Sequence, residues 1–207
     1  MGRLVDQLID LARKESLSHE HGAQELPLVN LSRLTREAAA QMLPLMEAKG
    51  RRLEVDVPNT AQLRGRADDL RDMVRNLLDN ALVHGRGSVR ARIVPPPPGG
   101  TTLTLEVRDE GSGVPAGQED SVFERFRRLN AQTPGSGLGL AIVRQVTRSH
   151  GGNARFVPGE GRIVVQLPCE SPAAAAGRSR LKNPLAAPMT DGSETETHDD
   201  RGQPDHV

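Results

Sequence analysis

Segments in which apolar and polar residues alternate, as they do in half-buried strands, are interleaved along this chain with amphipathic helical segments. Strands are predicted at residues 26–29, 52–57, 88–94, 101–107, 153–157 and 162–167, and helices at 31–50, 67–84 and 138–150. The linker PPPPGG joins two of the strands, so we expect a hairpin there, and the last two strands are expected to form another. This order of elements favours a small domain of mixed α+β type.

The composition limits what such a domain can bind. Lys and Arg together number 27, as do Asp and Glu, so the formal net charge is zero and no basic excess exists to neutralise nucleic-acid phosphates. Phe123, Phe126 and Phe156 are the whole aromatic content, too little for stacking the bases of a single strand. The sequence therefore predicts that nucleic acid is not a partner.

Two further features bear on where the chain resides. Cys169 is the one cysteine, which excludes an internal disulfide and favours a reducing compartment. No apolar run approaches the roughly 20 residues of a membrane span. We therefore expect a soluble, cytoplasmic fragment, and leave open whether its full-length parent is a membrane protein.

The two ends of the chain differ from its middle. Residues 1–16 contain an amphipathic helical pattern that begins without a capping residue. This helix could fold back on its own domain, or it could be half of a helical hairpin whose first half is missing. Residues 17–25 are typical of a linker, and residues 169–207 hold too few large apolar side chains to fold, so we expect disorder there. The folded domain is then predicted at 26–168.

The predicted helix 67–84 carries three polar side chains, Asn76, Asn80 and His84, at spacings that place them along one face. They could simply be the solvated face of a helix whose other face is apolar. Asparagine is a mediocre helix former, however, so two of them in a leucine-rich helix require an explanation. An Asn amide oxygen suits Mg²⁺, whose other ligands are usually waters and phosphate oxygens.

A glycine-rich segment follows the strand predicted at 101–107. Asp109 stands at the strand end, where its carboxylate can accept a hydrogen bond from an exocyclic amine such as that of adenine. Gly111 and Gly113 would let the backbone approach a planar ring closely. The segment could instead be a tight turn. Its match to the dinucleotide pattern G-x-G-x-x-A is rejected, because Gly117 would break the helix that this pattern requires.

A second glycine-rich segment, GSGLG at residues 135–139, runs directly into the helix predicted at 138–150. Backbone N–H groups at a helix N-terminus bind phosphate oxygens, helped by the helix dipole. The Gly-Lys-Ser/Thr sequence of a P-loop is absent from the chain. The segment therefore predicts a phosphate site of another kind.

The segment FERFRR at residues 123–128 lies between the two glycine-rich segments. It could be a short amphipathic helix that docks its phenylalanines. Alternatively, it could be part of a mobile lid from which Arg127 and Arg128 reach the terminal phosphates of a nucleotide.

Each of these segments is a weak signal alone, but their order and spacing are specific. Together they resemble the ATP-binding catalytic domain of sensor histidine kinases, within the superfamily that includes DNA gyrase B and heat-shock chaperones. The resemblance covers about Leu26 to Pro168. It implies a Bergerat-type ATP-binding fold, which is a two-layer α/β sandwich whose mixed sheet is covered on one face by helices.

The resemblance also implies roles for the matched residues. Asn76 would ligate Mg²⁺, and Asn80 would contact the phosphates of ATP. Asp109 would bond the adenine amine, in a pocket shaped by Gly111 and Gly113.

The remaining matches concern the phosphates. Arg127 or Arg128 would meet them from the lid, and His84 stands where the family usually has a Tyr or His beside the nucleotide. Val83 replaces a basic residue usual in the family, so one phosphate contact is lost or comes from elsewhere, and Asp72 replaces the more common Glu. The turn expected to hold the phosphates consists of Gly135, Gly137, Leu138 and Gly139.

The activity that the resemblance implies is transfer of the ATP γ-phosphoryl group to a histidine of a dimerisation hairpin, for signalling to a response regulator. Residues 1–16 look like the end of that hairpin, and no phosphoacceptor motif is present, so no catalytic residue is assigned. We expect a fragment that does not autophosphorylate alone. Two other functions stay open: a serine kinase of the anti-sigma-factor type, and a regulatory ATP-binding module without phosphotransfer.

Overall fold

The computed structural model describes residues 26–129 and 135–169. The predicted hairpin end (1–16), the predicted linker (17–25) and the predicted tail beyond Cys169 lie outside these residues. Cys169 itself is half-buried: its backbone N–H donates to the Thr101 carbonyl over 2.8 Å, and its side chain packs against the core. Cys169 therefore belongs with the sheet rather than with the predicted tail.

Five strands form one mixed sheet in the order β2-β4-β5-β7-β6. The β2–β4 pair is parallel, and the other three pairs are antiparallel. Both predicted hairpins are confirmed, since β4 pairs with β5 and β6 pairs with β7. The bounds are β2 Leu53–Asp56, β4 Val89–Val94, β5 Thr102–Arg108, β6 Asn153–Phe156 and β7 Arg162–Pro168.

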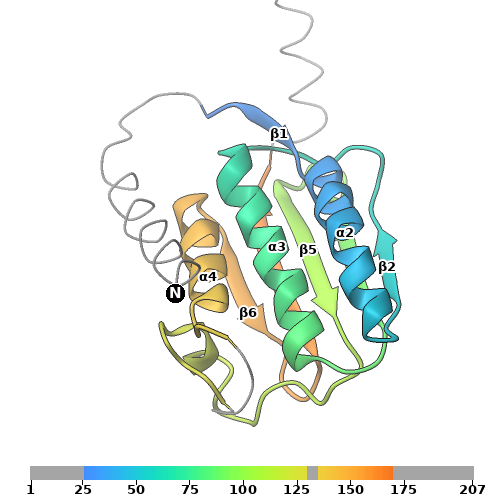
Figure 1. The fold of residues 1–207 in the computed structure, drawn as a ribbon. Helices are drawn as coiled ribbons and strands as arrows, with labels where there is room; N and C mark the ends of the chain where they lie inside the picture. The colour runs from blue at the N-terminus through green and yellow to red at the C-terminus, as the bar shows by residue number, and fades with distance from the viewer. Residues whose placement is uncertain (1–25, 130–134, 170–207) are drawn as a thin grey trace, which may run out of the picture.

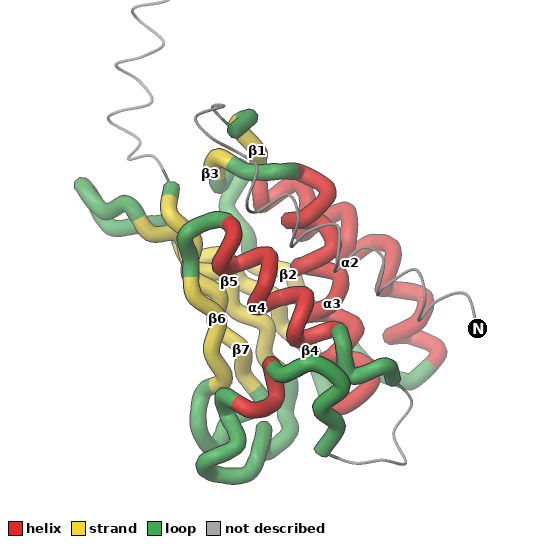
Figure 2. Tube along the Cα trace, turned by 90° about the vertical axis from the view of Figure 1, so that its left-hand side faces the viewer, coloured by secondary structure: helices red, strands yellow, loops and turns green. Residues whose placement is uncertain are grey.

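Two shorter strands, β1 Leu28–Asn30 and β3 Gln62–Arg64, form a separate antiparallel pair at the upper end of the molecule in Figure 2. The sequence pattern predicts β1 but not β3, because three residues are too few to show a clear alternation.

The three described α-helices lie on the same face of the five-stranded sheet (Figures 1 and 2). They are α2 Leu31–Ala48, α3 Ala67–His84 and α4 Gly139–Ser149, and a single 3₁₀ turn, η1 Ser121–Phe123, precedes α4. The predicted two-layer sandwich with a mixed sheet is confirmed. Within the described part of the chain, no helix has both the length and the apolar composition that crossing a bilayer requires.

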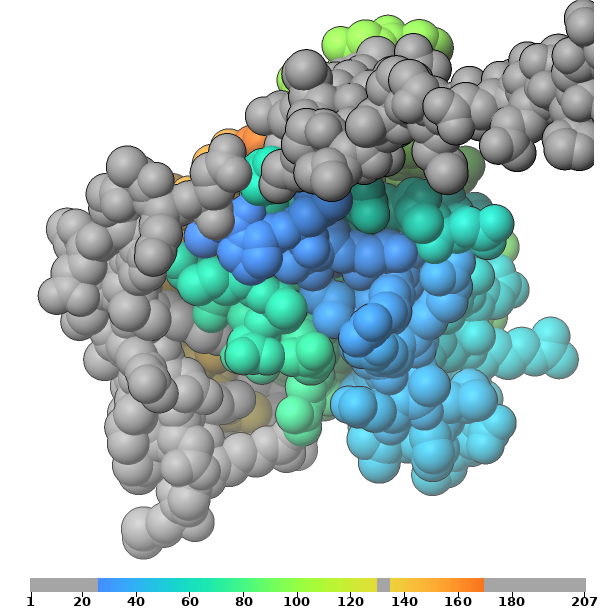
Figure 3. Space-filling model, turned by 90° about the horizontal axis from the view of Figure 1, so that it is seen from above, coloured from blue at the N-terminus to red at the C-terminus, as the bar shows by residue number. Residues whose placement is uncertain are grey.

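Helix α2 begins at a side-chain cap. The Asn30 Oδ1 atom accepts a hydrogen bond from the Arg33 N–H over 3.3 Å, and another from the Ala61 N–H over 3.3 Å. One side chain thus caps the helix and ties it to the loop before β3. The helix continues through the exposed Pro44. Seen from above, α2 (blue) and the adjoining part of α3 (blue-green) lie side by side (Figure 3).

The hydrophobic core lies between α3 and the inner face of the sheet. Because side chains alternate across a strand, every second residue of β4, β5 and β7 points toward the helices. The buried residues that fill this layer include Leu70, Met73, Val74, Leu77 and Leu78 of α3, Val89, Ala91 and Ile93 of β4, Leu103, Leu105 and Val107 of β5, and Ile163, Val165 and Leu167 of β7.

A buried histidine joins the end of α4 to the start of α3. The His150 Nε2 atom accepts a hydrogen bond from the Arg66 N–H over 3.1 Å, and Nδ1 lies 2.8 Å from the Val146 carbonyl oxygen. These two contacts require a neutral ring with its proton on Nδ1. Desolvation lowers the pKa of His150, as does the charge of Arg66, while the Val146 carbonyl and Asp69 act in the opposite direction.

We predict that Leu77→Ala lowers the free energy of unfolding by about 2–5 kcal/mol, since Leu77 has no exposed surface and its truncation leaves a cavity. Leu45→Ala on α2 is the matched control: its side chain is 52% exposed, so the change should be below about 0.5 kcal/mol. Urea denaturation measures both. Equal losses would contradict the placement of α3 at the centre of the core.

We also predict that the stability of the wild-type protein falls as the pH is lowered below about 6.5, the unperturbed pKa of histidine. The lowered pKa of His150 means that the unfolded chain takes up the proton more readily, so acid favours unfolding. His150→Gln keeps a hydrogen-bond acceptor but cannot titrate, and should show a shallower decline. Urea denaturation of both proteins between about pH 7.5 and 5.5 measures the free energy of unfolding. If it falls equally in the two proteins, the prediction is wrong.

Candidate nucleotide-binding site

A cavity of about 770 Å³ opens where the C-terminal half of α3, the loop after β5 and the start of α4 meet. The predicted site residues that line it are Asn76, Asn80, His84, Asp109, Gly111, Gly113, Arg127, Arg128, Gly135, Gly137 and Gly139. Leu138 is the exception, because its side chain is fully buried in the core and its backbone N–H donates to the Ser136 hydroxyl over 3.2 Å. The structure thus brings the three predicted segments to one hollow.

The Asp109 carboxylate is clamped by backbone groups. Its Oδ1 atom accepts hydrogen bonds from the N–H of Arg86, over 3.0 Å, and from the N–H of Gly111, over 2.7 Å. The Oδ2 atom has no hydrogen-bond partner among the described residues, so it is left for a ligand. A Cβ atom on Gly85 would lie 2.5 Å from the Asp109 Cγ atom, so this neighbour has to be glycine.

The first glycine-rich segment packs against the β6–β7 turn. Gly113 has φ +72°, and a Cβ atom there would lie 2.1 Å from the Glu160 carbonyl oxygen. The Asp109 N–H donates to the Gly161 carbonyl over 2.7 Å. The segment is therefore a tight turn, as the simpler interpretation expects, and this turn also forms one wall of the cavity.

Asn76 faces the second glycine-rich segment. Its Nδ2 atom donates to the Asp72 carbonyl over 2.8 Å, which is one turn back along α3. Its Oδ1 atom lies at the first residue of α4, because a Cβ atom on Gly139 would be 3.1 Å away. The amide oxygen is thus turned toward the N-terminus of α4, where backbone N–H groups and the helix dipole favour negative charge.

The phenylalanine segment differs from the prediction. Phe123 is buried, but Phe126 is 56% exposed and has φ +61°, so only one of the two rings docks. The Phe126 N–H donates to the Gly137 carbonyl over 2.9 Å, which joins this segment to the second glycine turn. Arg144 of α4 holds the other end, with Nη2 3.1 Å from Asp120 Oδ1 and its guanidinium 5.4 Å from the Phe123 ring centre.

His84 and Arg128 lie close enough to affect each other. Desolvation lowers the pKa of His84, and the positive charge of Arg128 lowers it further. His84 is therefore predominantly neutral at pH 7, so the arginines supply the positive charge on this side of the cavity.

Some residues that line the cavity were not predicted from the sequence motifs. Arg86 follows the helix-ending Gly85 and supplies both a cation and the N–H that holds Asp109. Asp79 precedes Asn80 on α3, and Ser136 lies inside the second glycine turn. Val83 replaces a basic residue that is usual in the family, and this departure could have indicated that a nearby arginine, Arg86, supplies the charge instead.

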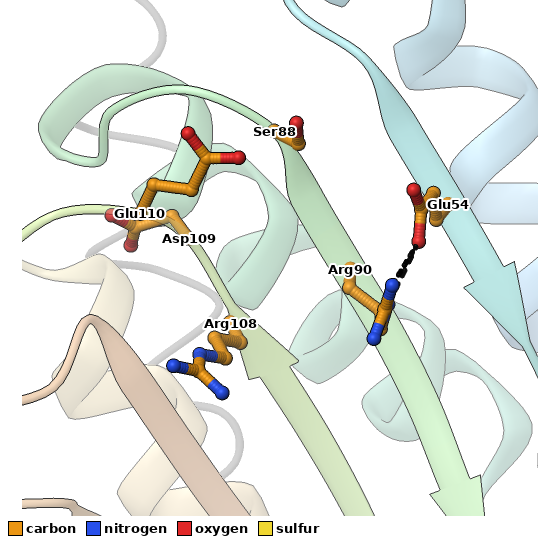
Figure 4. Close-up of a pocket in the computed structure, with 6 residues that line it drawn as sticks. All are labelled: Glu54, Ser88, Arg90, Arg108, Asp109 and Glu110. Atoms are coloured by element: carbon orange, nitrogen blue, oxygen red, sulfur yellow. Dashed lines mark hydrogen bonds and ion pairs between the residues drawn. The ribbon is translucent and has the colours of Figure 1, made fainter.

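A smaller hollow of about 410 Å³ lies on the opposite, open face of the sheet (Figure 4). Asp109 lines both hollows. In the smaller one the Arg90 guanidinium pairs with Glu54 over 2.6 Å. Hydrogen bonds from the Ser88 side chain and backbone lower the pKa of Glu110. Neither a glycine turn nor a helix start contributes to its lining.

Residues 65–171 match the family described as histidine kinase-, DNA gyrase B-, and HSP90-like ATPase. The probable sensor histidine kinase TcrY of Mycobacterium tuberculosis is 34% identical over 177 residues, which cover 81% of this chain and 35% of TcrY. The histidine-protein kinase/phosphatase MprB of a Mycobacterium species is 36% identical over 167 residues, covering 77% of this chain and 30% of MprB. The chain thus spans about a third of the length of these relatives.

Solved structures give the same result. The mycobacterial sensor histidine kinase MprB has a TM-score of 0.58 at 31% identity, and the match covers 69% of this chain and 97% of that one. The ATP-binding domain of PrrB from Mycobacterium tuberculosis has a TM-score of 0.55 at 31% identity, covering 72% and 100%. Full-length ShkA in complex with AMPPNP has a TM-score of 0.66 at 26% identity, covering 81% and 35%. The chain therefore belongs to the histidine kinase-, DNA gyrase B-, and HSP90-like ATPase family, and contains an ATP-binding catalytic domain of the sensor histidine kinase type.

Proposed function

We propose that the large cavity binds ATP with Mg²⁺ and that this chain is the phosphoryl-donating part of a sensor histidine kinase. The observation that carries the proposal is the meeting of the asparagine face of α3, Asp109 and the start of α4 at one hollow. The relatives named as sensor histidine kinases, and the nucleotide analogue in the ShkA structure, support it.

The adenine end of the site is Asp109. With Oδ1 occupied by two backbone N–H groups, Oδ2 is the acceptor left for the exocyclic amine of adenine. A hydrogen bond to a charged acceptor contributes about 1.5–3 kcal/mol. The turn at Gly111 and Gly113 would lie against the ring, and this arrangement selects a base with an amino group at that position.

The phosphate end combines α4 with the arginines. Backbone N–H groups at Gly137 and Gly139 precede or begin α4, whose dipole favours the anionic phosphates. Arg127 and Arg128 also line the cavity, in the segment that is bonded to the Gly137 turn. Arg86 supplies the positive charge that Val83 cannot.

Asn76 is the residue that would hold the magnesium ion. Its amide oxygen is turned toward α4, and no group of three or more His, Cys, Asp or Glu side chains among the described residues could bind a metal by itself. One protein oxygen supplemented by phosphate oxygens and waters is the usual environment of Mg²⁺ in nucleotide sites. When bound, the ion would neutralise the charge that develops on the transferring phosphoryl group.

The acceptor is a histidine of a dimerisation hairpin, whose phosphoacceptor motif is absent from this sequence. The bond between the γ-phosphorus and the β–γ bridging oxygen would break, a phosphorus–nitrogen bond would form, and ADP would leave. The role of the residues described above is to hold ATP in position and to balance its charge. A response regulator would then receive the phosphoryl group from the histidine.

We predict that Asp109→Asn weakens ATP binding about tenfold or more, because the amide retains the shape but loses the charged acceptor for the adenine amine. Asp56→Asn is the control: this carboxylate is 67% exposed on the open face of the sheet and pairs with Arg92. Calorimetric titration with ATP and Mg²⁺ measures both variants. Unchanged affinity in Asp109→Asn would remove the adenine assignment.

The phosphotransfer itself is tested with a dimerisation hairpin from a related sensor kinase, added to this protein with Mg²⁺ and ATP labelled at the γ-position. We expect acid-labile, base-stable label on the hairpin, and its loss in Asn76→Ala. Acid-stable label would indicate a serine kinase instead. ATP binding without any label transfer would indicate a regulatory module.

A further inference from the structure

We propose that Arg51, which lies outside the cavity, is a positioning residue that sets the selectivity of this site for adenine by holding the loop that clamps Asp109. The inference rests on the proposed function, in which Asp109 recognises the adenine amine. Arg51 lies between α2 and β2, and it is absent from the cavity lining.

The Arg51 guanidinium binds two carbonyl oxygens in the last turn of α3 and one in the connection that follows. Its Nη1 atom donates to the Ala81 carbonyl over 2.7 Å and to the Leu82 carbonyl over 3.0 Å, and its Nε atom donates to the Gly87 carbonyl over 2.7 Å. The last carbonyls of a helix have no partner within the helix and carry partial negative charge. Arg51 therefore fixes the C-terminus of α3 to the connection that follows it.

The opposite side of the same connection holds Asp109. The Arg86 N–H donates to Asp109 Oδ1 over 3.0 Å, and the Arg86 carbonyl accepts from the Glu110 N–H over 2.9 Å. Gly85 packs directly on the Asp109 carboxylate. The three residues 85–87 are thus held between an arginine on one side and the loop after β5 on the other.

The connection has little freedom to shift without moving Asp109. Gly87 has φ +57°, a conformation that other residues rarely adopt, and its carbonyl is held by Arg51. At the other end, the Val89 N–H donates to the Arg52 carbonyl over 2.8 Å, next to Arg51 in the chain. A change in the hold of Arg51 on Gly87 would therefore be transmitted to Arg86 and to the carboxylate.

The chemistry of the contact requires arginine. One planar guanidinium reaches carbonyls on both α3 and Gly87, whereas a lysine ammonium is a single point charge on a flexible stem. The Nη2 atom is buried without a hydrogen-bond partner among the described residues. An unpaired buried donor is unfavourable, so the three carbonyl bonds have to offset it.

The test compares ATP with purine riboside triphosphate, which lacks the 6-amino group, in calorimetric titrations with Mg²⁺. We expect the wild-type protein to prefer ATP about tenfold, and Arg51→Met to reduce this preference to within about twofold by weakening ATP binding alone. Arg51→Lys should fall between the two. In an Asp109→Asn background, Arg51→Met should have no further effect on ATP affinity.

Arg36→Met is the matched control. Arg36 also donates to loop carbonyls, those of Pro58 over 2.7 Å and Val57 over 3.3 Å, but it does not touch the connection at 85–87. Its loss should leave the preference for ATP unchanged. A second readout needs no nucleotide: hydrogen exchange of the Arg86 amide should speed up in Arg51→Met and not in Arg36→Met.

The outcomes separate the inference from the function on which it rests. A wild-type protein that binds neither nucleotide, or binds both equally, would contradict the proposed function. If Arg51→Met keeps the wild-type preference for ATP, or binds both nucleotides more weakly by the same factor, Arg51 only stabilises the fold. If Arg51→Met does not fold, the same comparison in Arg51→Lys decides.

Discussion

The whole arrangement of the cavity depends on how the Asp109 carboxylate is held. One of its oxygens accepts N–H groups from Arg86 and Gly111, so it joins the connection after α3 to the loop after β5. Glycine at position 85 allows the carboxylate to lie against that connection without a clash. Two N–H groups on one oxygen fix the direction in which the carboxylate points. The second oxygen can then serve recognition, while α3, the loop after β5 and the start of α4 supply the other walls.

Helix α3 connects the loop that holds Asp109 to the hydrophobic core, because one face of the helix is buried and the neighbouring face lines the cavity. Leu77 and Leu78 are fully buried against the sheet, while Asn76 and Asn80 line the cavity from the neighbouring face. The burial of the leucines fixes the rotation of the helix, and the asparagines are carried into place by it. The two faces of the sheet also differ. Its inner face is apolar, and its open face carries cross-strand ion pairs such as Glu54–Arg90 and Asp56–Arg92. These exposed pairs contribute little stability individually.

The sequence predicts those parts of the structure that follow from local periodicity and spacing. The bounds of α3 agree with the predicted 67–84, because a regular apolar stripe ends at a glycine. The shared hollow was predicted from the resemblance, which assigns the asparagine face of α3, the segment after β5 and the glycine turn before α4 to one nucleotide. By contrast, β3 is too short to leave a pattern, and Phe126 is exposed and has a positive φ, which this residue type rarely adopts. The side chain of Leu138 belongs to the core although its neighbours line the cavity, and Arg51 and Arg86 act through contacts between distant segments. Such contacts leave no trace in sequence spacing.

The most direct test of the central claim is a crystal structure of this protein with Mg²⁺ and a non-hydrolysable ATP analogue. The account predicts that the analogue occupies the large cavity, with its exocyclic amine within hydrogen-bond distance of Asp109 Oδ2 and its phosphates at the first turn of α4 beside Asn76. An analogue bound in the smaller hollow on the open face of the sheet, or with its base away from Asp109, would contradict it.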